Sequence, residues 1–325
     1  MRVCVVGAGL AGALLTWRLA QSGATVDVIT GRHRRTDATA ASGGAVRAYE
    51  PDSELRRLAA ASLAELLASP TLQDWGGYRS GQCTYLLGDH VDGGPDIADI
   101  DGAYLATASD LARDGWAGLR GTEAAVVETR AGYLDPDRLR TAILRDAASS
   151  PGVHVRDETL STVQTGGYDA VVVAAGPWTA GLLRASGMPA GGLRTKSIQY
   201  AIHPATGWPD GAVVDVTGMY GVPTADGLLL GLATDRWDVD PDAPPFLASW
   251  QDEAVRLARE RFPALRIGPA TRHVGAADCY GDGPGLALHQ AVGTVFTFTG
   301  GAGGSAKTAL AASRQAADEL LAARS

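Results

Sequence analysis

Residues 3–12 read VCVVGAGLAG, an apolar run that leads directly into the spacing Gly-x-Gly-x-x-Gly. Gly7 permits a tight turn, Gly9 lets the backbone approach a pyrophosphate, and Gly12 lets a following helix pack close to the strand. A second apolar run, VDVI at residues 26–29, follows the expected helix. This order predicts a dinucleotide site with the diphosphate at the helix N-terminus. The alternative is a glycine-rich turn with a purely structural role.

The composition narrows the class of protein. The chain has 325 residues, 46% of them hydrophobic, which suits two domains or one domain with a large insertion. Its formal charge of −8 argues against nucleic acid as a partner, because phosphate binding needs clustered positive charge. No apolar run reaches about 18 residues, so we expect no membrane span.

The cysteines and histidines show no disulfide or metal pattern. Cys4, Cys83 and Cys279 are an odd number and lie far apart in the sequence. They predict neither a disulfide framework nor a zinc site, and they favour a reducing cytoplasm as the location. The six histidines lack metal-ligand spacing, so we expect no bound metal.

Hydrophobic periodicity predicts an α/β fold. The expected strands cover residues 2–6, 25–30, 83–87, 153–155, 170–174, 198–202, 212–216, 228–232, 270–278 and 292–298. The expected helices cover residues 11–22, 53–68, 136–148 and 247–262, with a last one after the glycine run at 300–304. This order predicts a Rossmann-type nucleotide-binding domain interleaved with an antiparallel-sheet substrate domain. The first would comprise 1–80, 135–190 and 290–325, and the second 81–134 and 191–289.

Five motifs, in this order along the chain, carry a resemblance to a known family. They are GAGLAG at 7–12, ASGGAVR at 41–47, GYLDP at 132–136, DAVVVAAGPW at 169–178 and GGAGG at 300–304. Together they resemble the D-amino acid oxidase superfamily of flavoproteins, which includes glycine oxidase and monomeric sarcosine oxidase. The resemblance covers nearly the whole chain.

The resemblance implies FAD as the cofactor. The first turn would take the pyrophosphate, and the last glycine turn would meet the flavin ring with a helix N-terminus that stabilises negative charge. The implied FAD-binding residues are Gly7, Gly9, Leu10, Ala11, Gly12, Thr30, Gly31, Arg32, Ser42, Gly43, Gly44, Ala45, Ala175, Gly176, Trp178, Cys279, Gly301, Gly303, Gly304, Ser305 and Lys307.

Three residues are candidates for the catalytic site. By the resemblance, Lys307 would contact the ring and the substrate carboxylate, and Arg47 would bind that carboxylate through its guanidinium fork. Tyr220 would lie over the substrate. The alternatives are a solvent-exposed lysine, a surface arginine and a core aromatic residue.

Cys279 lies where sarcosine oxidase-like enzymes carry a cysteine joined covalently to the flavin. The family form is Cys-x-Tyr, whereas Tyr280 follows Cys279 directly in this chain. A covalent link and a buried free thiol both stay open.

Two departures from the family pattern keep other functions open. Thr30 replaces the acid expected at the end of the second strand, and the arginine-rich residues 31–35 follow it. That cluster could meet a 2′-phosphate, so an NADPH-dependent reductase is an alternative. Leu229 aligns with the lysine that activates oxygen in sarcosine oxidase, which leaves oxidase and dehydrogenase both possible.

The favoured function is a FAD-dependent oxidoreductase acting on CH–NH donors. It would oxidise a C–N bond of an amino acid or related amine to an imine by hydride transfer to flavin N5. The expected partner is this small-molecule substrate, with no nucleic acid and no membrane, and the oligomeric state is open. A flavin-binding protein without turnover is the alternative outside the enzyme class.

Overall fold

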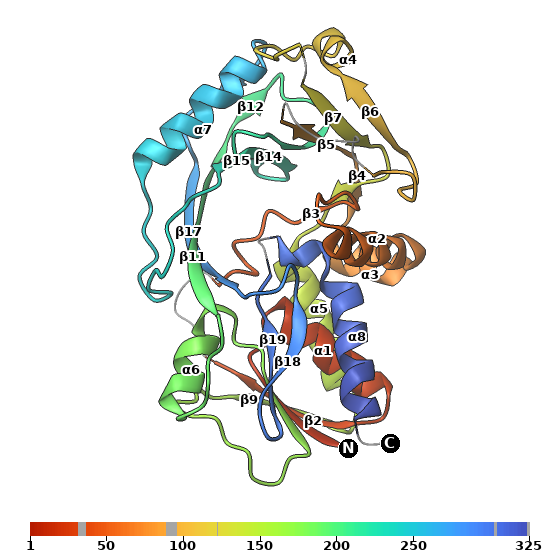
Figure 1. Ribbon diagram of the computed structural model, residues 1–325, viewed down its shortest axis with the longest axis vertical. Helices are drawn as coiled ribbons and strands as arrows, with labels where there is room; N and C mark the ends of the chain where they lie inside the picture. The colour runs from red at the N-terminus through yellow and green to blue at the C-terminus, as the bar shows by residue number, and fades with distance from the viewer. Residues whose placement is uncertain (32–36, 89–95, 122, 302–303, 324–325) are drawn as a thin grey trace.

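The structure is a computed structural model that describes residues 1–31, 37–88, 96–121, 123–301 and 304–323. Its two large sheets lie toward opposite ends of an elongated molecule (Figure 1). One sheet has six strands and the other has eight. The expected mixture of a parallel Rossmann-type sheet and a largely antiparallel sheet is confirmed.

The six-stranded sheet is built on the glycine motif. Its strands, in spatial order, are β18 (Ala287–Val292), β19 (Val295–Thr299), β10 (Ala170–Val173), β1 (Arg2–Val6), β2 (Thr25–Thr30) and β9 (Val153–Asp157). The pairs from β19 to β9 are parallel, and β18 is antiparallel to β19. The β18–β19 hairpin replaces the single strand expected at 292–298, because polar residues in β18 hide its alternation.

Helices cover both faces of this sheet, because its central strands are apolar on both sides. Val3 and Val5 of β1 pack into one core cluster, and Cys4 and Val6 pack into another on the opposite face. The helices on the first face are α1 (Leu10–Gln21), α5 (Pro136–Ala148) and α8 (Ala309–Ala322), as Figure 1 shows. The second face is covered by α6 (Thr179–Ala185).

The GYLDP motif marks the start of α5. The Asp135 side chain accepts hydrogen bonds from the amides of Asp137 and Arg138, and Pro136 occupies the first turn. Both features favour a helix start, since they satisfy or remove amides that lack a partner within the helix. Helices α2 (Ser53–Ala68) and α3 (Pro70–Gly76) begin with similar caps at Asp52 and Ser69, and α2 packs against α8.

The eight-stranded sheet forms the other half of the molecule. Its strands, in spatial order, are β17 (Arg272–Tyr280), β11 (Arg194–His203), β15 (Gly227–Leu232), β14 (Met219–Thr224), β13 (Gly211–Val214), β5 (Gln82–Leu87), β7 (Ala124–Glu128) and β6 (Ala103–Thr107). Every neighbouring pair is antiparallel except β13 and β5, which are parallel. The expected antiparallel sheet thus contains one parallel pair, because β5 comes from an earlier part of the chain than β13.

Helix α7 (Ala248–Arg261) packs against β15 and β14, and the short α4 (Ala108–Arg113) follows β6. The small sheets are β12 (Ala205–Thr206) with β16 (Arg266–Ile267), and β3 (Ala45–Val46) with β8 (Gly132–Tyr133) and β4 (Arg79–Ser80).

The long strands β11 and β17 extend from the eight-stranded sheet toward the six-stranded one (Figure 1). The end of β17 contacts the 3₁₀ turn η1 (Gly176–Trp178), which follows β10. Residues from both sheets can therefore line one shared site. The division of the chain into two discontinuous domains stays a prediction.

Candidate active site

A cavity of about 1420 Å³ lies between the two sheets. It is lined by the β1–α1 turn, the segment at 37–47, strands β11, β13 and β17, and the last glycine turn. This volume exceeds the roughly 300–1,000 Å³ of an ordinary small-molecule pocket. The cavity therefore has space for a large cofactor together with a small substrate.

The nucleotide end of the cavity is built from backbone. Gly7 has φ +109°, and a Cβ atom there would lie 2.4 Å from the carbonyl oxygen of Ala174 in the turn after β10. A Cβ atom on Gly12 would lie 2.0 Å from the Gly7 carbonyl oxygen. Both positions require glycine, because a side chain would collide with backbone. The turn thus has the close packing that the sequence predicts.

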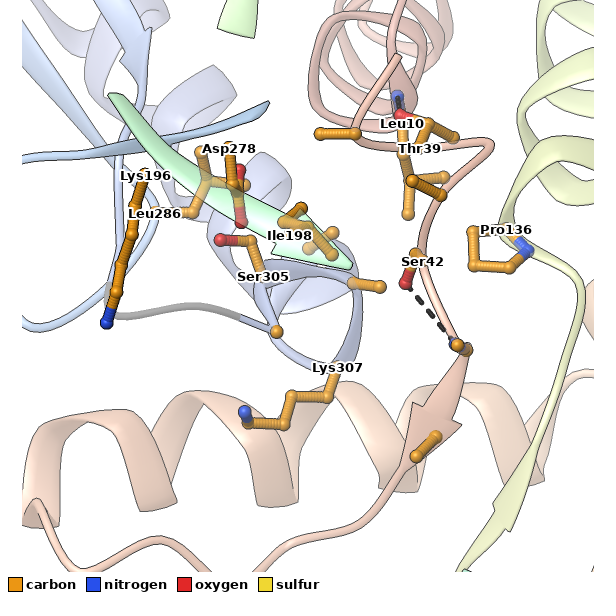
Figure 2. Close-up of a pocket in the computed structure, with 18 of the residues that line it drawn as sticks. Leu10, Thr39, Ser42, Pro136, Lys196, Ile198, Asp278, Leu286, Ser305 and Lys307 are labelled. Carbon is orange, nitrogen blue, oxygen red and sulfur yellow. Dashed lines mark hydrogen bonds between the residues drawn. The ribbon is translucent and has the colours of Figure 1, made fainter. Parts of the chain in front are cut away.

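The N-terminus of α1 faces this end of the cavity. Gly9 precedes the helix and offers no side chain to cap it, and the amide of Leu10 donates to Thr39 Oγ1 at 3.0 Å. Figure 2 shows Leu10 and Thr39 together at the cavity wall. Apart from this contact, the helix has no cap from its own Gly9, and such a helix N-terminus is a suitable place for a diphosphate. The residues present therefore fit the dinucleotide end of FAD.

Most of the expected FAD-binding residues line this cavity. They are Gly7, Gly9, Leu10, Ala11, Thr30, Gly31, Ser42, Gly43, Gly44, Ala45, Ala175, Gly176, Trp178, Gly304, Ser305 and Lys307. Gly12, Gly301 and Cys279 are described but are not among the lining residues. Arg32 and Gly303 lie outside the described residues.

Strand β2 ends in Thr30, so it offers no acid to a ribose at the expected position. Asp37, seven residues further along the chain, provides a carboxylate that lines the cavity. Thr30 Oγ1 donates to the carbonyl of Arg156 at 3.3 Å. Asp37 lines the same cavity, where it pairs with Arg140 from α5 and accepts the amide of Ala40 at 2.9 Å. Sequence reasoning missed this pair, because Asp37 and Arg140 lie far apart in the chain. The arginine-rich residues 32–35 lie outside the described part.

Arg47 and Lys307 meet at one carboxylate. Glu50 Oε1 lies 2.9 Å from Arg47 Nη1 and 2.7 Å from Lys307 Nζ, and all three side chains are buried. Arg47 also stacks on the Tyr85 ring, with 4.9 Å from the guanidinium carbon to the ring centroid. The structure therefore brings both predicted carboxylate-binding residues to the cavity and adds Glu50, which sequence reasoning missed.

The burial of this cluster has opposite consequences for its two cations. Desolvation and the nearby Arg47 charge lower the pKa of Lys307, against the effect of Glu50. Desolvation also opposes the charge of Arg47, but Glu50 and other anionic neighbours prevail and raise its pKa. Lys307 is thus the cation that loses its proton more readily. It lies in η2 (Ser305–Lys307), after Gly304 in the left-handed conformation.

Glu128 of β7 fixes the backbone that carries Arg47 and Glu50. Its carboxylate accepts the amides of Ala48 at 2.7 Å and Tyr49 at 2.9 Å. Burial nevertheless raises the pKa of Glu128. Because these two amides lie between Arg47 and Glu50 in the chain, Glu128 holds the ion pair in position without lining the cavity itself.

Tyr220 of β14 lines the cavity, as expected for a residue over the substrate. Its hydroxyl donates to the carbonyl oxygen of Gln199 at 3.1 Å, and burial raises its pKa. Its ring occupies the space above Gly231, where a Cβ atom would lie 2.5 Å from it. This packing gives the ring one fixed orientation.

Strand β17 separates Cys279 from its two neighbours. Asp278 and Tyr280 line the cavity, whereas Cys279 is buried and does not. Successive side chains of a strand point to opposite faces, which explains the separation. The Cys279 thiol instead interacts with Thr299 of β19, and burial raises its pKa to about 11. The structure does not bring this residue to the proposed flavin site.

Both lysines of the chain line the cavity. Leu229, at the position compared with an oxygen-activating lysine, is buried in an apolar cluster. Lys196 of β11 is not at the Leu229 position. Its Nζ atom lies 4.8 Å from the Trp237 ring centroid and 5.5 Å from that of Tyr280. Sequence reasoning assigned Lys196 no role.

The described residues show neither a metal-binding cluster nor a membrane-spanning helix. No group of three or more His, Cys, Asp or Glu side chains there could hold a metal ion. None of the helices there combines the length and apolar character that crossing a membrane requires.

The sequence model of a family described as "FAD dependent oxidoreductase" (DAO) matches residues 2–319. No curated protein matches the chain.

Several solved structures share the fold. L-proline dehydrogenase from P. horikoshii is 17% identical with a TM-score of 0.79, and the match covers 99% of this chain and 93% of that one. Glycine oxidase from Geobacillus kaustophilus is 20% identical with a TM-score of 0.75, covering 99% and 94%. Iminodiacetate oxidase from Chelativorans sp. BNC1 is 22% identical with a TM-score of 0.72, covering 98% and 94%.

Proposed function

Because the chain belongs to the FAD-dependent oxidoreductase family, we propose that it oxidises a C–N bond of an amino acid or related amine to an imine. When bound, FAD would supply the acceptor for the hydride, at its N5 atom. The observation that carries the proposal is that one cavity among the described residues is lined both by the α1 N-terminus and by Arg47 and Lys307, which pair with Glu50. The three related structures named above act, by their descriptions, on proline, glycine and iminodiacetate.

The chain's own residues would bind and orient the substrate. Arg47 and Lys307 carry two positive charges against the one carboxylate of Glu50, so the cluster can still attract a substrate carboxylate. Tyr220, fixed by its bond to Gln199, would limit where the rest of the substrate lies. Positioning of this kind can supply much of the rate of a reaction that needs one reactive geometry.

The glycine-lined end would hold the FAD diphosphate at the α1 N-terminus. The last glycine turn, with Gly304, Ser305 and Lys307 on the cavity wall, would meet the flavin ring. A cation at the ring favours negative charge on it, which is the chemical reason to place Lys307 there.

The test is an anaerobic titration of the purified holoprotein with a panel of amino acids and amines. We expect the yellow flavin absorbance to bleach with at least one of them. Reoxidation in air then separates an oxidase from a dehydrogenase. A protein whose flavin is reduced by dithionite but by no member of the panel would contradict the proposal and favour a flavin-binding protein without turnover.

A further inference from the structure

The charged side chains around the cavity are mostly paired. The pairs are Asp37 with Arg140, Arg56 with Asp96, Asp215 with Arg261, and Arg47 and Lys307 with Glu50. In the described residues, two lining charges have no such ion pair: Lys196 and Asp278. The Lys196 ammonium contacts aromatic rings instead. Asp278 is therefore the carboxylate in the cavity wall whose charge no ion pair compensates.

The position of Asp278 directs its carboxylate to the cavity. It lies in β17 opposite Lys196 of β11, and its Oδ1 atom accepts the amide of Cys279 at 2.8 Å. Its Oδ2 atom has no hydrogen bond within the described part of the chain. Figure 2 shows Asp278 among the residues that line the cavity, while the Lys196 ammonium points away from it. One oxygen is thus anchored and the other is available to a ligand.

The surroundings of Asp278 also suit proton exchange near neutral pH. Burial raises its pKa to about 6, and the charge of Lys307 opposes that rise. The titratable groups around it are Cys279 and Tyr280 on its own strand, Lys196 on β11 and Lys307 on η2. Of these, burial raises the pKa of Cys279 and Tyr280 and keeps both neutral, so Asp278 is the anion of the set.

Resting on the proposed function, we propose that Asp278 binds the ammonium group of the substrate and accepts one of its protons. An amine with a pKa of about 10 arrives protonated at neutral pH, and its nitrogen lone pair is then unavailable. In the transfer one N–H bond breaks and one O–H bond forms, leaving a neutral amine and a protonated Asp278. The proton later leaves to solvent.

This assignment specifies the substrate class. The carboxylate of a zwitterionic amino acid would face Arg47 and Lys307, while its ammonium faces Asp278. Arg47, Lys307 and Asp278 all line the same cavity, and the charge of Lys307 lowers the pKa of Asp278 against the effect of burial. The proposal thus favours small α-amino acids over amines that carry no carboxylate.

The test uses the holoenzyme with Asp278→Asn and Asp278→Glu, and Asp226→Asn as the control. Asp226 lies exposed in the β14–β15 turn of the same sheet, so its variant makes the same change of net charge away from the cavity. The rate of anaerobic flavin reduction by an amino acid is measured from pH 5 to 10. Flavin content and melting temperature are measured for each variant.

For the wild type and the Asp226 variant, we expect the rate to rise up to about pH 6, where Asp278 loses its proton, and then to level off. Asp278→Asn should reduce the plateau rate by roughly 10²–10⁴-fold, the range for losing a general base. Its remaining rate should instead increase about tenfold per pH unit toward the amine pKa near 10. Asp278→Glu should restore part of the plateau.

A second readout does not depend on turnover. Glycine betaine carries a permanent cation and a carboxylate, whereas acetate carries the carboxylate alone, and both can be titrated by their effect on the flavin spectrum. We expect Asp278→Asn to weaken betaine binding about tenfold, on the scale of one charged contact, and to leave acetate binding unchanged or stronger.

The outcomes separate this proposal from the proposed function. An Asp278→Asn enzyme with the wild-type pH profile and betaine affinity would overturn the role of Asp278, even if its flavin content or melting temperature fell. A wild type that no amino acid reduces at any pH would instead overturn the proposed function.

Discussion

The two ends of the cavity differ in the part of the protein that meets the ligand. At the nucleotide end, backbone atoms of a glycine turn and a helix N-terminus preceded by Gly9 face the cavity. At the substrate end, the surface consists of side chains from four separate segments: Arg47, Tyr220, Asp278 and Lys307. The first end depends on residues that lack side chains, and the second on side chains that chain folding brings together. Substitutions should therefore affect the two ends in different ways.

The largest effect on FAD retention is expected at the nucleotide end, from Gly7→Ala. The new methyl group would meet the Ala174 carbonyl at 2.4 Å in a backbone conformation with φ +109°. Strain and overpacking together should cost roughly 2–5 kcal/mol and abolish FAD retention. Flavin absorbance per protein and the free energy of unfolding measure the two losses.

Gly23→Ala is the matched control for that comparison. Gly23 also has positive φ, at +77°, but a Cβ atom there would meet nothing within 4 Å. It should cost only about 1 kcal/mol and keep the flavin. Equal flavin loss in both variants would show that the close approach at Gly7 has no special part in the site.

The substrate end should respond next most strongly, through Glu50→Gln. Glu50 is the shared partner of two buried cations, and its loss should destabilise the fold by roughly 3–5 kcal/mol, the cost of leaving a buried charge unpaired. Chemical denaturation of the holoprotein measures this change.

Glu260→Gln removes the carboxylate of the exposed i,i+4 pair with Arg256 and provides the contrast. Such a pair contributes only about 0.3–0.5 kcal/mol. A Glu50 variant as stable as the Glu260 variant would mean that the buried triad does not hold the substrate end together.

The same contrast explains what could be predicted from the sequence. The glycine spacing at 7–12 predicted the turn, its helix and the neighbouring pair β1 and β2, because those contacts lie close together in the chain. The pairs of β1 with β10 and of β10 with β19 join segments that are far apart in the sequence. The three-residue spacing of Arg47 and Glu50 could have indicated their ion pair. Nothing in the sequence indicated that Lys307, near the far end of the chain, contacts the same carboxylate.

Strand β17 shows that the sequence alone does not tell which side chains of a strand face the cavity. Sequence comparison drew attention to Cys279, although the Cys-x-Tyr form counted back from Tyr280 points to residue 278. The alternation of side chains in the strand then decides the matter, since Asp278 and Tyr280 share the cavity face. A strand's face can be predicted only once its partner is known, and β11 pairs with it from about 80 residues away.

Arg47→Ala tests the substrate end more selectively. If its guanidinium binds the substrate carboxylate, KM for an amino acid should rise more than about tenfold, the scale of one charged hydrogen bond. Arg56→Ala is the control, because Arg56 also lines the cavity but pairs with the exposed Asp96. Steady-state kinetics measure both. An unchanged KM in the Arg47 variant, with flavin still bound, would rule out that role.

The smallest effect is expected from Cys279→Ala. This variant tests whether FAD is held by noncovalent contacts alone or also by a covalent bond to the thiol. The thiol lies on the opposite side of β17 from Asp278 and interacts with Thr299, and its raised pKa keeps it unreactive. Acid precipitation of the wild type should therefore release FAD into the supernatant. The variant should keep its flavin and lose only about 1 kcal/mol of stability, as for deleting one buried group. Flavin retained in the wild-type pellet but released from the variant would show that the strand turns Cys279 to the ring, and it would remove Asp278 from the cavity face at the same time.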